Sequence, residues 1–352
     1  MRLLITGGAG FVGSTLALSW RRDHPGDDVI AVDNLQKSDS ALRVARLEAG
    51  GVRFVHADAT TLTEIDGLGS VQWVIDCAAD PSVKTGYDGG VARLIQTHLG
   101  ATAGSLQLCQ REGAGILFLS TSRVHPIAQL RALPLEEASS RLQLTAGRAG
   151  SGWSPSGIGP GFPLDGYRSP YGASKLAAEL MIEEYAEAHD IPAVVNRCGV
   201  ISGPWQMGSV DQGFIALWAA RHLWGESLRY MGFGGTGLQV RDILHVADLY
   251  DLIVRQIQTV QSGFQVQYVG GGTARTTSLR ELTEACQQRA GRSIEILPHP
   301  ETHRSDVPYY VTDLSAVHHA TGWAPTRSHA ELLDDVFGWL RAERHIIESR
   351  FQ

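Results

Sequence analysis

Short apolar runs alternate with stretches of helical character along the N-terminal part of the chain. The apolar runs that we interpret as strands are RLLIT at 2–6, DDVIAVD at 27–33, VRFVHAD at 52–58, VQWVIDCAA at 71–79 and GILFLSTS at 115–122. The longest helix-like stretch between them covers about 88–112. Strands that alternate with helices are typical of a parallel sheet covered on both faces. The pattern predicts an α/β fold with a doubly wound parallel sheet and a ligand at the carboxyl ends of its strands.

A glycine-rich turn follows the first apolar run. The sequence TGGAGFVGS places Gly7, Gly10 and Gly13 at the spacing of a dinucleotide-binding turn, and the helix-like stretch LALSWRRDH comes next. Glycine lets the backbone turn tightly and approach a pyrophosphate, while the N-terminus of the helix faces the phosphate charge. We therefore expect these glycines, with Phe11 and Val12, to bind the pyrophosphate of a dinucleotide.

Acidic residues close the second and third strands. Asp33 lies about 20 residues beyond the glycines, a position suited to the ribose hydroxyls of adenosine. Its carboxylate would repel a 2′-phosphate, and residues 34–37 contain no arginine, although they contain Lys37, so NAD is predicted rather than NADP. Asp58 fits the same cleft and fits equally well as the N-cap of a helix at TTLTEI. The other residues expected to line the cofactor site are Asn34, Ala59, Ala78 and Ala79.

The stretch RSPYGASKLAAE at 168–179 holds a tyrosine and a lysine four residues apart. Pro170 stops a helix upstream and the residues after it are strongly helical, so Tyr171 and Lys175 share one helix face. The neighbouring ammonium favours the phenolate and lowers the tyrosine pKa from about 10. The pair predicts a general base that accepts a proton from a hydroxyl group. The alternative is an ordinary surface pair. The chain contains only three lysines, so a lysine at this position favours a specific role over chance.

With TGGAGFVG, Asp33, CAAD, LSTS and YGASK in this order, the chain resembles the extended short-chain dehydrogenase/reductase family. Within it, the chain is similar to the NAD-dependent epimerase/dehydratase branch that acts on nucleotide sugars. The resemblance covers nearly the whole chain. It implies a Rossmann domain, a catalytic set of Thr121, Tyr171 and Lys175, and a bond from the lysine to the nicotinamide ribose. It also implies a homodimer in which the helices near 88–112 and 172–189 pair.

The resemblance extends to the expected substrate contacts. The segment GFGGTGLQVRDILHVADL at 232–249 resembles the family's G-x-G-x-Q-x-R-D-x-x-H-V-x-D motif, whose arginine, Arg241 here, binds the diphosphate. A guanidinium pairs bidentately with phosphate, and the alternative for Arg241 is a salt bridge with Asp242 or Asp248. HRSDVPYYVTD at 303–313 resembles the segment with a second diphosphate arginine, here Arg304. Arg123 and Gln212 complete the predicted substrate contacts.

The neighbours of Thr121 narrow the reaction. Relatives that remove water from the sugar have Asp-Glu after the Ser or Thr, because a carbon-bound proton must leave and a hydroxyl must be protonated. Ser122 and Arg123 stand there in this chain. Without that acid pair a plain dehydratase is disfavoured, and reversible hydride abstraction and return remains.

Two further departures from the family are His125 in place of a tyrosine and His98 in place of an asparagine. Neither belongs to the proton-transfer pair, so both bear on the fine geometry of the site and not on its chemistry.

A tripeptide, Asp211-Gln212-Gly213, follows GPWQMG and resembles the CDP-tyvelose (CDP-paratose) 2-epimerases. The prediction is a nucleotide-sugar epimerase that uses tightly bound NAD for transient oxidation and re-reduction, at C2 of a CDP-hexose. The alternatives are another redox step on a sugar nucleotide, such as 4-epimerisation or keto-reduction, and a non-catalytic dinucleotide sensor. A sensor has no need of a proton-transfer group, which disfavours the last alternative.

Domain organisation follows from the same patterns. We expect the NAD-binding domain at 1–197, with roughly 238–262 returning to it, and a smaller mixed α/β substrate lobe from 198–237 and 263–352. The Gly-, Ser- and Pro-rich stretch 123–168 is expected to be a loop, either a lid or a disordered segment, and a lid is favoured.

Charge and hydropathy exclude some classes of partner. A net charge of −7 leaves no basic field for nucleic acid or an anionic membrane. The chain has no signal-peptide pattern and no apolar run of about 18 residues, so a cytoplasmic protein is expected. The cysteines and histidines show no metal-ligand spacing, and no metal is predicted.

Overall fold

A computed structural model describes residues 1–65, 67–87, 89–210 and 212–351. The chain divides into two compact units. The first unit comprises Met1–Val124, Pro170–Arg197 and Tyr250–Gln267. The second comprises His125–Ser169, Cys198–Leu249 and the chain from Tyr268 onward.

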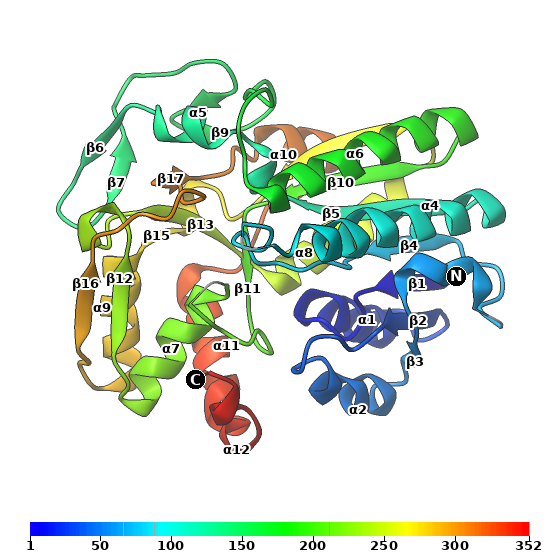
Figure 1. Ribbon diagram of the computed structural model, residues 1–352. Coiled ribbons are helices and arrows are strands. Elements are labelled where there is room, and N and C mark those ends of the chain that lie inside the picture. The colour runs from blue at the N-terminus through cyan, green and yellow to red at the C-terminus, as the bar shows by residue number, and fades with distance from the viewer. Residues whose placement is uncertain (66, 88, 211, 352) are drawn as a thin grey trace. The chain divides into compact units, whose positions relative to one another are not determined.

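A seven-stranded sheet forms the centre of the first unit (Figure 1). Its strands lie in the order β14-β10-β5-β4-β1-β2-β3, and the pairings of β1 with β2 and β4, β2 with β3, and β4 with β5 are parallel. The strands are β1 (Arg2–Thr6), β2 (Asp28–Asp33), β3 (Arg53–His56), β4 (Trp73–Asp76), β5 (Gly115–Thr121), β10 (Ala193–Cys198) and β14 (Phe264–Val269). The strand order reverses between β1 and β4, which is where a doubly wound sheet places its ligand crevice.

Burial explains the unbroken apolar runs of these strands. All seven residues of β5 and all four of β4 are buried, as expected for parallel strands covered on both faces. The buried side chains of Leu4, Ile30, Val74 and Phe118 belong to one core cluster with residues of the helices. The α/β doubly wound fold predicted from the sequence is confirmed.

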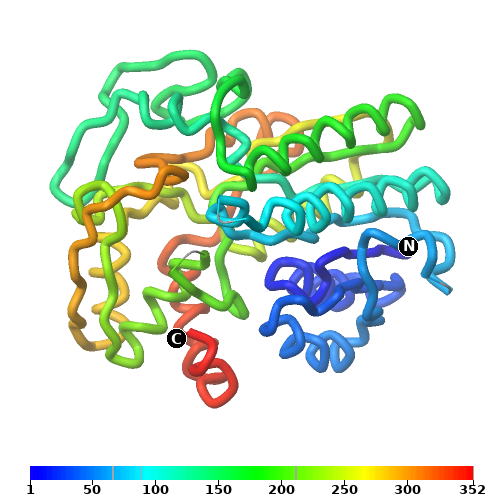
Figure 2. Tube along the Cα trace, viewed as in Figure 1, coloured from blue at the N-terminus to red at the C-terminus, as the bar shows by residue number. Residues whose placement is uncertain are grey.

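Helices cover the sheet of the first unit. They are α1 (Phe11–Asp23), α2 (Ala41–Ala49), η1 (Ala59–Glu64), α3 (Val91–Ile95), η2 (Gln96–Gly100), α4 (Ala101–Glu112), η3 (Ser122–Val124) and α6 (Pro170–His189), and α8 (Val246–Thr259) joins them by its larger part. Helix α4 packs against α6 and over β4 and β5, while α1 packs on β1 and β2. The trace of α3, η2 and α4 is one continuous helical run, cyan in Figure 2.

The second unit contains a small mixed sheet and a group of helices. Strands β11 (Val200–Ser202), β13 (Val240–His245) and β15 (Thr276–Ser278) pair in that order, and β17 (Tyr309–Tyr310) also pairs with β13. Strands β12 (Leu228–Met231) and β16 (Ile296–His299) form a separate parallel pair. Helix α7 (Phe214–Trp224) packs against α9 (Leu279–Ala290) and α11 (His329–Ala342). The shorter helices are η4 (Phe233–Gly235), η5 (Thr273–Arg275), α10 (Ser315–Thr321), α12 (Arg344–Ile347) and η6 (Glu348–Arg350).

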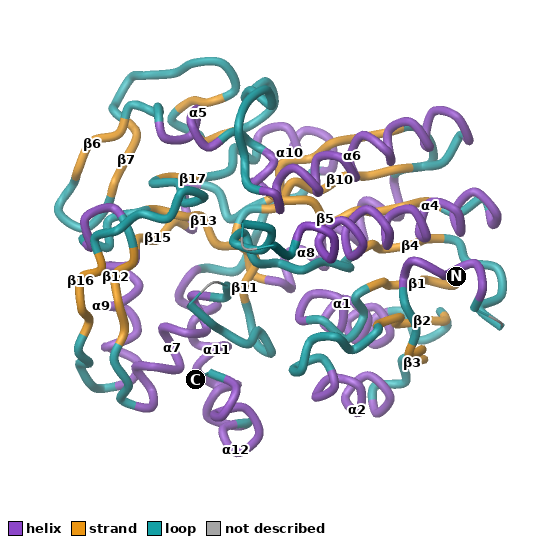
Figure 3. Tube along the Cα trace, viewed as in Figure 1, coloured by secondary structure: helices purple, strands orange, loops and turns teal. Residues whose placement is uncertain are grey.

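The stretch 125–169 has structure of its own, so the expectation of a plain loop at 123–168 is wrong. It contains α5 (Ile127–Arg131), the antiparallel pair β6 (Leu135–Glu137) with β7 (Leu142–Leu144), and the pair β8 (Trp153–Ser154) with β9 (Gly157–Ile158) (Figure 3). Buried Ile127, Ile158 and Phe162 pack with Tyr310 and Val311 of the second unit. This shared core places the stretch in the second unit.

The compact units differ from the expected domain bounds in two places. The segment His125–Ser169 belongs to the second unit, and the segment that returns to the first unit runs from Tyr250 to Gln267 rather than over 238–262. Among the described residues, no helix is both long enough and apolar enough to span a bilayer.

Candidate active site

The glycine turn between β1 and α1 packs backbone against backbone. Gly7 has a φ of +59°, which favours glycine, and a Cβ built on it would lie 2.8 Å from the carbonyl oxygen of Cys77. A Cβ on Gly13 would collide with the carbonyl oxygen of Gly7. Gly10 is the N-cap of α1. Side chains at Gly7 and Gly13 would collide with neighbouring backbone, so this close turn requires glycine, as a dinucleotide-binding turn does.

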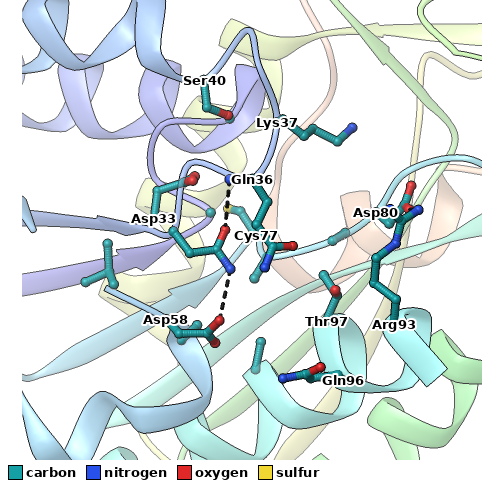
Figure 4. Close-up of a pocket in the computed structure, with 18 residues that line it drawn as sticks. Asp33, Gln36, Lys37, Ser40, Asp58, Cys77, Asp80, Arg93, Gln96 and Thr97 are labelled. Carbon is teal, nitrogen blue, oxygen red and sulfur yellow. Dashed lines mark hydrogen bonds and ion pairs between the residues drawn. The ribbon is translucent and has the colours of Figure 1, made fainter. Parts of the chain in front are cut away.

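A pocket of about 260 Å³ opens beside this turn, in the first unit (Figure 4). It is lined by residues at the ends of β1, β2, β3 and β4 and by residues of η2. The predicted cofactor residues that line it are Gly7, Gly10, Asp33, Asn34, Asp58, Ala59, Ala78 and Ala79. The predicted residues Phe11, Val12 and Gly13 form the first turn of α1 instead, and Tyr171 and Lys175 lie on α6.

Asp33 ties the end of β2 to the glycine turn. Its carboxylate accepts hydrogen bonds from the backbone N–H groups of Ala9, at 3.1 Å, and Leu35, at 2.8 Å. Burial raises the pKa of Asp33, and the same two hydrogen bonds oppose that shift. Lys37 also lines the pocket, and burial lowers the pKa of its ammonium group. The adenosine end of the pocket thus carries both the predicted acid and the lysine noted beside it.

Asp58 performs both of the roles that the sequence left open. Its carboxylate caps η1 by accepting from the N–H of Thr60 at 2.9 Å, and it lines the pocket. The side-chain amide of Asn34 donates to the same carboxylate at 3.0 Å, drawn as a dashed line in Figure 4. Burial alone would raise the pKa of Asp58, but the hydrogen bonds from Thr60 and Asn34 outweigh it and lower that pKa.

The Tyr171–Lys175 pair lies in the first turns of α6, which begins at Pro170. Proline suits the first helical position, where its missing N–H is not needed. Lys175 is 2% exposed, and its Nζ donates to the carbonyl oxygen of Leu119 at 3.0 Å and lies 4.3 Å from the centre of the Phe118 ring. The lysine is therefore held against β5, the strand that ends in Thr121.

Thr121 is the last residue of β5 and is nearly buried. Its Oγ1 accepts a hydrogen bond from the N–H of Arg123 at 3.2 Å. Among the described residues, no acceptor receives the hydroxyl hydrogen of Thr121, so this hydroxyl is available as a donor. The structure thus brings Thr121 and Lys175 to the same strand end, with Tyr171 one turn before the lysine.

A buried ionic network under this strand end was missed in the sequence. Ser120 donates to Glu179, and the guanidinium of Arg197 donates to both carboxylate oxygens of Glu179, from Nε to Oε1 at 3.2 Å and from Nη2 to Oε2 at 2.6 Å. Glu179 lies one turn after Lys175 on α6, and Arg197 lies on β10. Because buried charges are stable only when paired, this network fixes α6 to the two strands that flank it.

His98, which stands in place of an asparagine common in the resembling family, is a second buried group that the sequence did not assign. It is 1% exposed, and its ring contacts the ring of Tyr171 edge-on at a centroid distance of 5.4 Å. Its position in η2 places it between the pocket and the start of α6. No pattern in the sequence signals this contact, because the two residues are far apart along the chain.

The predicted substrate residues divide between the units. Arg123 lies in η3 of the first unit, whereas Gln212, Arg241 and Arg304 lie in the second. Gln212 exchanges backbone hydrogen bonds with Ser209. Asp211 of the predicted tripeptide lies outside the described residues.

Three arginines of the second unit meet at the turn 303–307. Arg241 donates to the carbonyl oxygen of Val307 at 2.6 Å, and Arg131 donates to the carbonyl oxygens of Asp306 and His303. Arg304 extends from the turn, and its Nε donates to the hydroxyl of Tyr167 at 2.8 Å. Arg131 was missed, since an arginine in a stretch expected to be a loop carries no motif. The cluster has the charge that a diphosphate requires.

The carboxylate of Asp248 makes other contacts than the ion pair with Arg241 that was the alternative. Asp248 accepts from the backbone N–H groups of Thr326 and Arg327 and pairs with the Arg327 guanidinium at 2.7 Å. It lies at the start of α8 and holds the chain before α11.

No group of three or more metal-ligating side chains occurs within the part of the chain that the structure describes. The geometry instead places Tyr171, the candidate proton-transfer group, one helical turn before the buried ammonium of Lys175, which is held against the strand that ends in Thr121. The adjoining pocket fits a dinucleotide. Such a site can take a proton from a substrate hydroxyl while a bound nicotinamide accepts the hydride.

Known proteins are similar to this chain in sequence and in fold. The family model described as "NAD dependent epimerase/dehydratase family" matches residues 3–270. CDP-paratose 2-epimerase of Salmonella typhi is 26% identical over 351 residues, which cover 96% of this chain and 99% of that protein. dTDP-glucose 4,6-dehydratase of Streptomyces niveus is 26% identical and covers 98% of this chain and 94% of its own. The structure of UDP-glucose 4-epimerase of Thermus thermophilus in complex with NAD has a TM-score of 0.74 and 26% identity, covering 97% and 99%.

Proposed function

The chain belongs to the NAD-dependent epimerase/dehydratase family, and we propose that it is a nucleotide-sugar epimerase that acts at C2 of a CDP-hexose. The proposal rests on one observation above all. The Lys175 ammonium is buried against the end of β5, next to Thr121 and one helical turn from Tyr171. This is the arrangement that proton removal from a sugar hydroxyl requires.

Each residue of the set has a distinct task. Tyr171 accepts the hydroxyl proton in the oxidative half-reaction and gives it back in the reductive one. Lys175 stabilises the ionised phenol through its charge, and Thr121 donates a hydrogen bond to the same sugar oxygen. When bound at the pocket, NAD supplies the reversible hydride acceptor; Gly7, Asp33 and Asp58 would hold it there. Inversion then requires the transient ketone to turn its other face toward the reduced nicotinamide before the hydride returns.

The residues after Thr121 favour epimerisation over dehydration. A dehydratase needs an acid and a base in addition to the tyrosine, because it must remove a carbon-bound proton and protonate a hydroxyl. Ser122 and Arg123 occupy the η3 turn that directly follows β5. Neither side chain supplies a carboxyl group for that chemistry.

Two features support C2 of a CDP-hexose. The Salmonella typhi protein named CDP-paratose 2-epimerase aligns with nearly all of this chain. The tripeptide Asp211-Gln212-Gly213 also resembles that group. We assign Arg241 and Arg304, from the arginine cluster at 303–307, to the diphosphate of the sugar nucleotide.

A second candidate is another redox step on a sugar nucleotide. The likeness to the Thermus thermophilus UDP-glucose 4-epimerase favours 4-epimerisation, which uses the same proton-transfer set. A keto-reductase would also use it but would exchange its cofactor at each turnover. Retention of the cofactor separates the two reaction types.

We propose further that the enzyme is a homodimer. Four large apolar side chains on adjoining α3 and α6 are exposed, namely Val91, Ile95, Leu180 and Met181. A second copy that pairs the same helices would cover them. Light scattering should give the mass of a dimer, and Leu180→Glu should give a monomer.

The test of the function is a substrate panel. Purified protein, with no added cofactor, is incubated with CDP-, UDP-, GDP- and dTDP-hexoses, and NMR identifies the carbon that inverts. We expect bound NAD after purification and inversion at C2 of a CDP-hexose. Inversion at C4 would replace this proposal with the second candidate, and a requirement for added reduced cofactor would indicate a reductase.

A further inference from the structure

The helical run α3–η2–α4 contains one turn with a different hydrogen-bond spacing. Residues Gln96–Gly100 form a π-helical turn, which accommodates an extra residue within a helix and is often found at functional sites. Gln96 and Thr97 of this turn line the nucleotide pocket, as Figure 4 shows. His98, the next residue, is 1% exposed and lies away from that pocket surface.

The imidazole of His98 joins two parts of the first unit. Its Nδ1 lies 2.7 Å from the hydroxyl of Ser174, which in turn donates to the carbonyl oxygen of Tyr171 at 2.9 Å. Its Nε2 lies 3.0 Å from the backbone N–H of Asp80, a residue of the pocket wall. One chain of hydrogen bonds therefore runs from the pocket wall, through His98 and Ser174, to the backbone of Tyr171.

One tautomer satisfies every group in this chain. A hydrogen on Nδ1 is donated to the Ser174 oxygen, which leaves the serine hydrogen for Tyr171 and leaves Nε2 to accept from Asp80. In the other tautomer, the Nε2–H would donate to the carbonyl oxygen of Asp80 at 3.2 Å, but the N–H of Asp80 would lose its acceptor, and the serine hydrogen would be needed for Nδ1 instead of Tyr171. The neutral ring with its hydrogen on Nδ1 is therefore the form that satisfies the whole chain of hydrogen bonds.

The surroundings keep the imidazole neutral. Burial, followed by the charge of Lys175, lowers the pKa of His98 to about 3. The charged groups around it are Lys175 on α6, Asp80 after β4, and Arg93 on α3, which pairs with Asp80 at 3.1 Å. An imidazolium here would place a second cation beside Lys175. The bridge is therefore stable across the ordinary working range of pH.

We propose that His98 is a positioning residue, which fixes Tyr171 relative to the bound dinucleotide by tying the first turn of α6 to the pocket wall at Asp80. The inference rests on the proposed function for the role of Tyr171 as the base. It adds a residue that packs against the Tyr171 ring and holds its backbone, and that accepts no proton from the substrate. Its loss should misplace the phenol while the pocket itself remains.

The first test observes Tyr171 directly and needs no substrate. The protein is labelled with 3-fluorotyrosine and saturated with NAD, and the Tyr171 resonance is identified by its absence in Tyr171→Phe. Loss of the imidazole ring beside Tyr171 moves this resonance by itself, so the midpoint of its pH titration is the readout. We expect His98→Ala to raise that midpoint, because a loosened turn separates the phenol from Lys175. Ser105→Ala, which deletes a buried hydroxyl on neighbouring α4, should leave the midpoint unchanged. An unchanged midpoint in His98→Ala would overturn the proposal.

Single-bond variants keep the proposal testable if His98→Ala does not fold. The amide nitrogen of Asn corresponds in reach to Nδ1, so His98→Asn can keep the bond to Ser174 and lose the one to Asp80. Ser174→Ala breaks the same chain at its other end. The change of the Tyr171 titration midpoint in the double variant should be smaller than the sum of the single changes, because both act through one path. Strictly additive changes of the midpoint would exclude that path.

Turnover separates this inference from the proposed function. With any CDP-, UDP-, GDP- or dTDP-hexose that the wild-type protein inverts, His98→Ala should lower kcat about 10- to 100-fold with little change in KM. If the wild-type protein inverts none of them, the proposed function fails, and the fluorine resonance still decides the role of His98. If wild type turns over and His98→Ala keeps its kcat, the positioning role fails alone.

Discussion

The candidate catalytic set and the candidate diphosphate site are built in different ways. In the first unit, Tyr171 and Lys175 are four residues apart on α6, and Thr121 ends the strand on which the lysine rests. In the second unit, Arg131, Arg241 and Arg304 come from α5, β13 and the turn 303–307. Chemistry that depends on close spacing is held by local structure, whereas charge that must only reach a flexible diphosphate is gathered from distant segments.

The largest effect is expected when the base is removed from the candidate catalytic set. Tyr171→Phe should lower kcat by about 10²- to 10⁴-fold, because a proton must then leave the sugar hydroxyl without a positioned acceptor. NAD should remain bound, since the pocket is lined by other residues. Tyr185→Phe, on the same helix α6, is the matched control. Steady-state kinetics and the absorbance of released cofactor measure both outcomes, and full activity in Tyr171→Phe would contradict the mechanism.

The next effect concerns stability. Glu179→Gln leaves the Arg197 guanidinium buried without its carboxylate and should lower the free energy of unfolding by about 3 to 5 kcal/mol. The control is the partly exposed pair of the second unit, where Glu281 accepts from Arg141 and caps α9. Glu281→Gln should cost only about 1 kcal/mol. Urea unfolding of both variants measures the difference, and equal losses would show that burial of the pair does not decide its contribution.

The same contrast explains what the sequence could predict. The strand pattern, the glycine turn and the Tyr171–Lys175 pair are local, so their periodicity and spacing are visible along the chain. The two placements of Asp58, at the cleft and as an N-cap, were visible as alternatives for the same reason. The strands of 125–169 are two or three residues long, which is too short to show alternation, and that stretch was expected to be a loop.

Contacts between distant residues were not predictable. His98 and Ser174 are 76 positions apart, and Glu179 and Arg197 lie on a helix and a strand whose charges look solvent-exposed in the sequence. A buried ion pair carries no local signal, because each partner alone is typical of a surface. Only the fold shows which charges meet.

A smaller effect is expected in the diphosphate site. Arg304→Ala removes a charge-assisted contact of about 1.5 to 3 kcal/mol, so KM for the sugar nucleotide should rise roughly 10- to 100-fold while kcat changes little. Tyr167→Phe is the matched control, because it keeps the ring beneath the guanidinium and loses the hydroxyl that accepts from Arg304 at 2.8 Å. We expect a smaller rise in KM for that variant. An unchanged KM in Arg304→Ala would remove this residue from the diphosphate site.

The smallest effect compares a buried histidine from each unit. The pKa of His98 is lowered to about 3 by burial and then by Lys175, and that of His329 to about 4 by burial and then by Arg289. The unfolded chain takes up these protons near pH 6.5 and the folded chain does not, so stability falls with acidification below pH 6.5. Each histidine should contribute up to about 1.4 kcal/mol per pH unit, down to its folded pKa. His98→Asn should weaken the pH dependence of stability in the unfolding transition of the first unit, and His329→Asn should weaken it in the transition of the second unit. Calorimetry between pH 7 and about pH 4.5 measures both. If neither variant changes the slope of stability against pH, the folded protein protonates both rings.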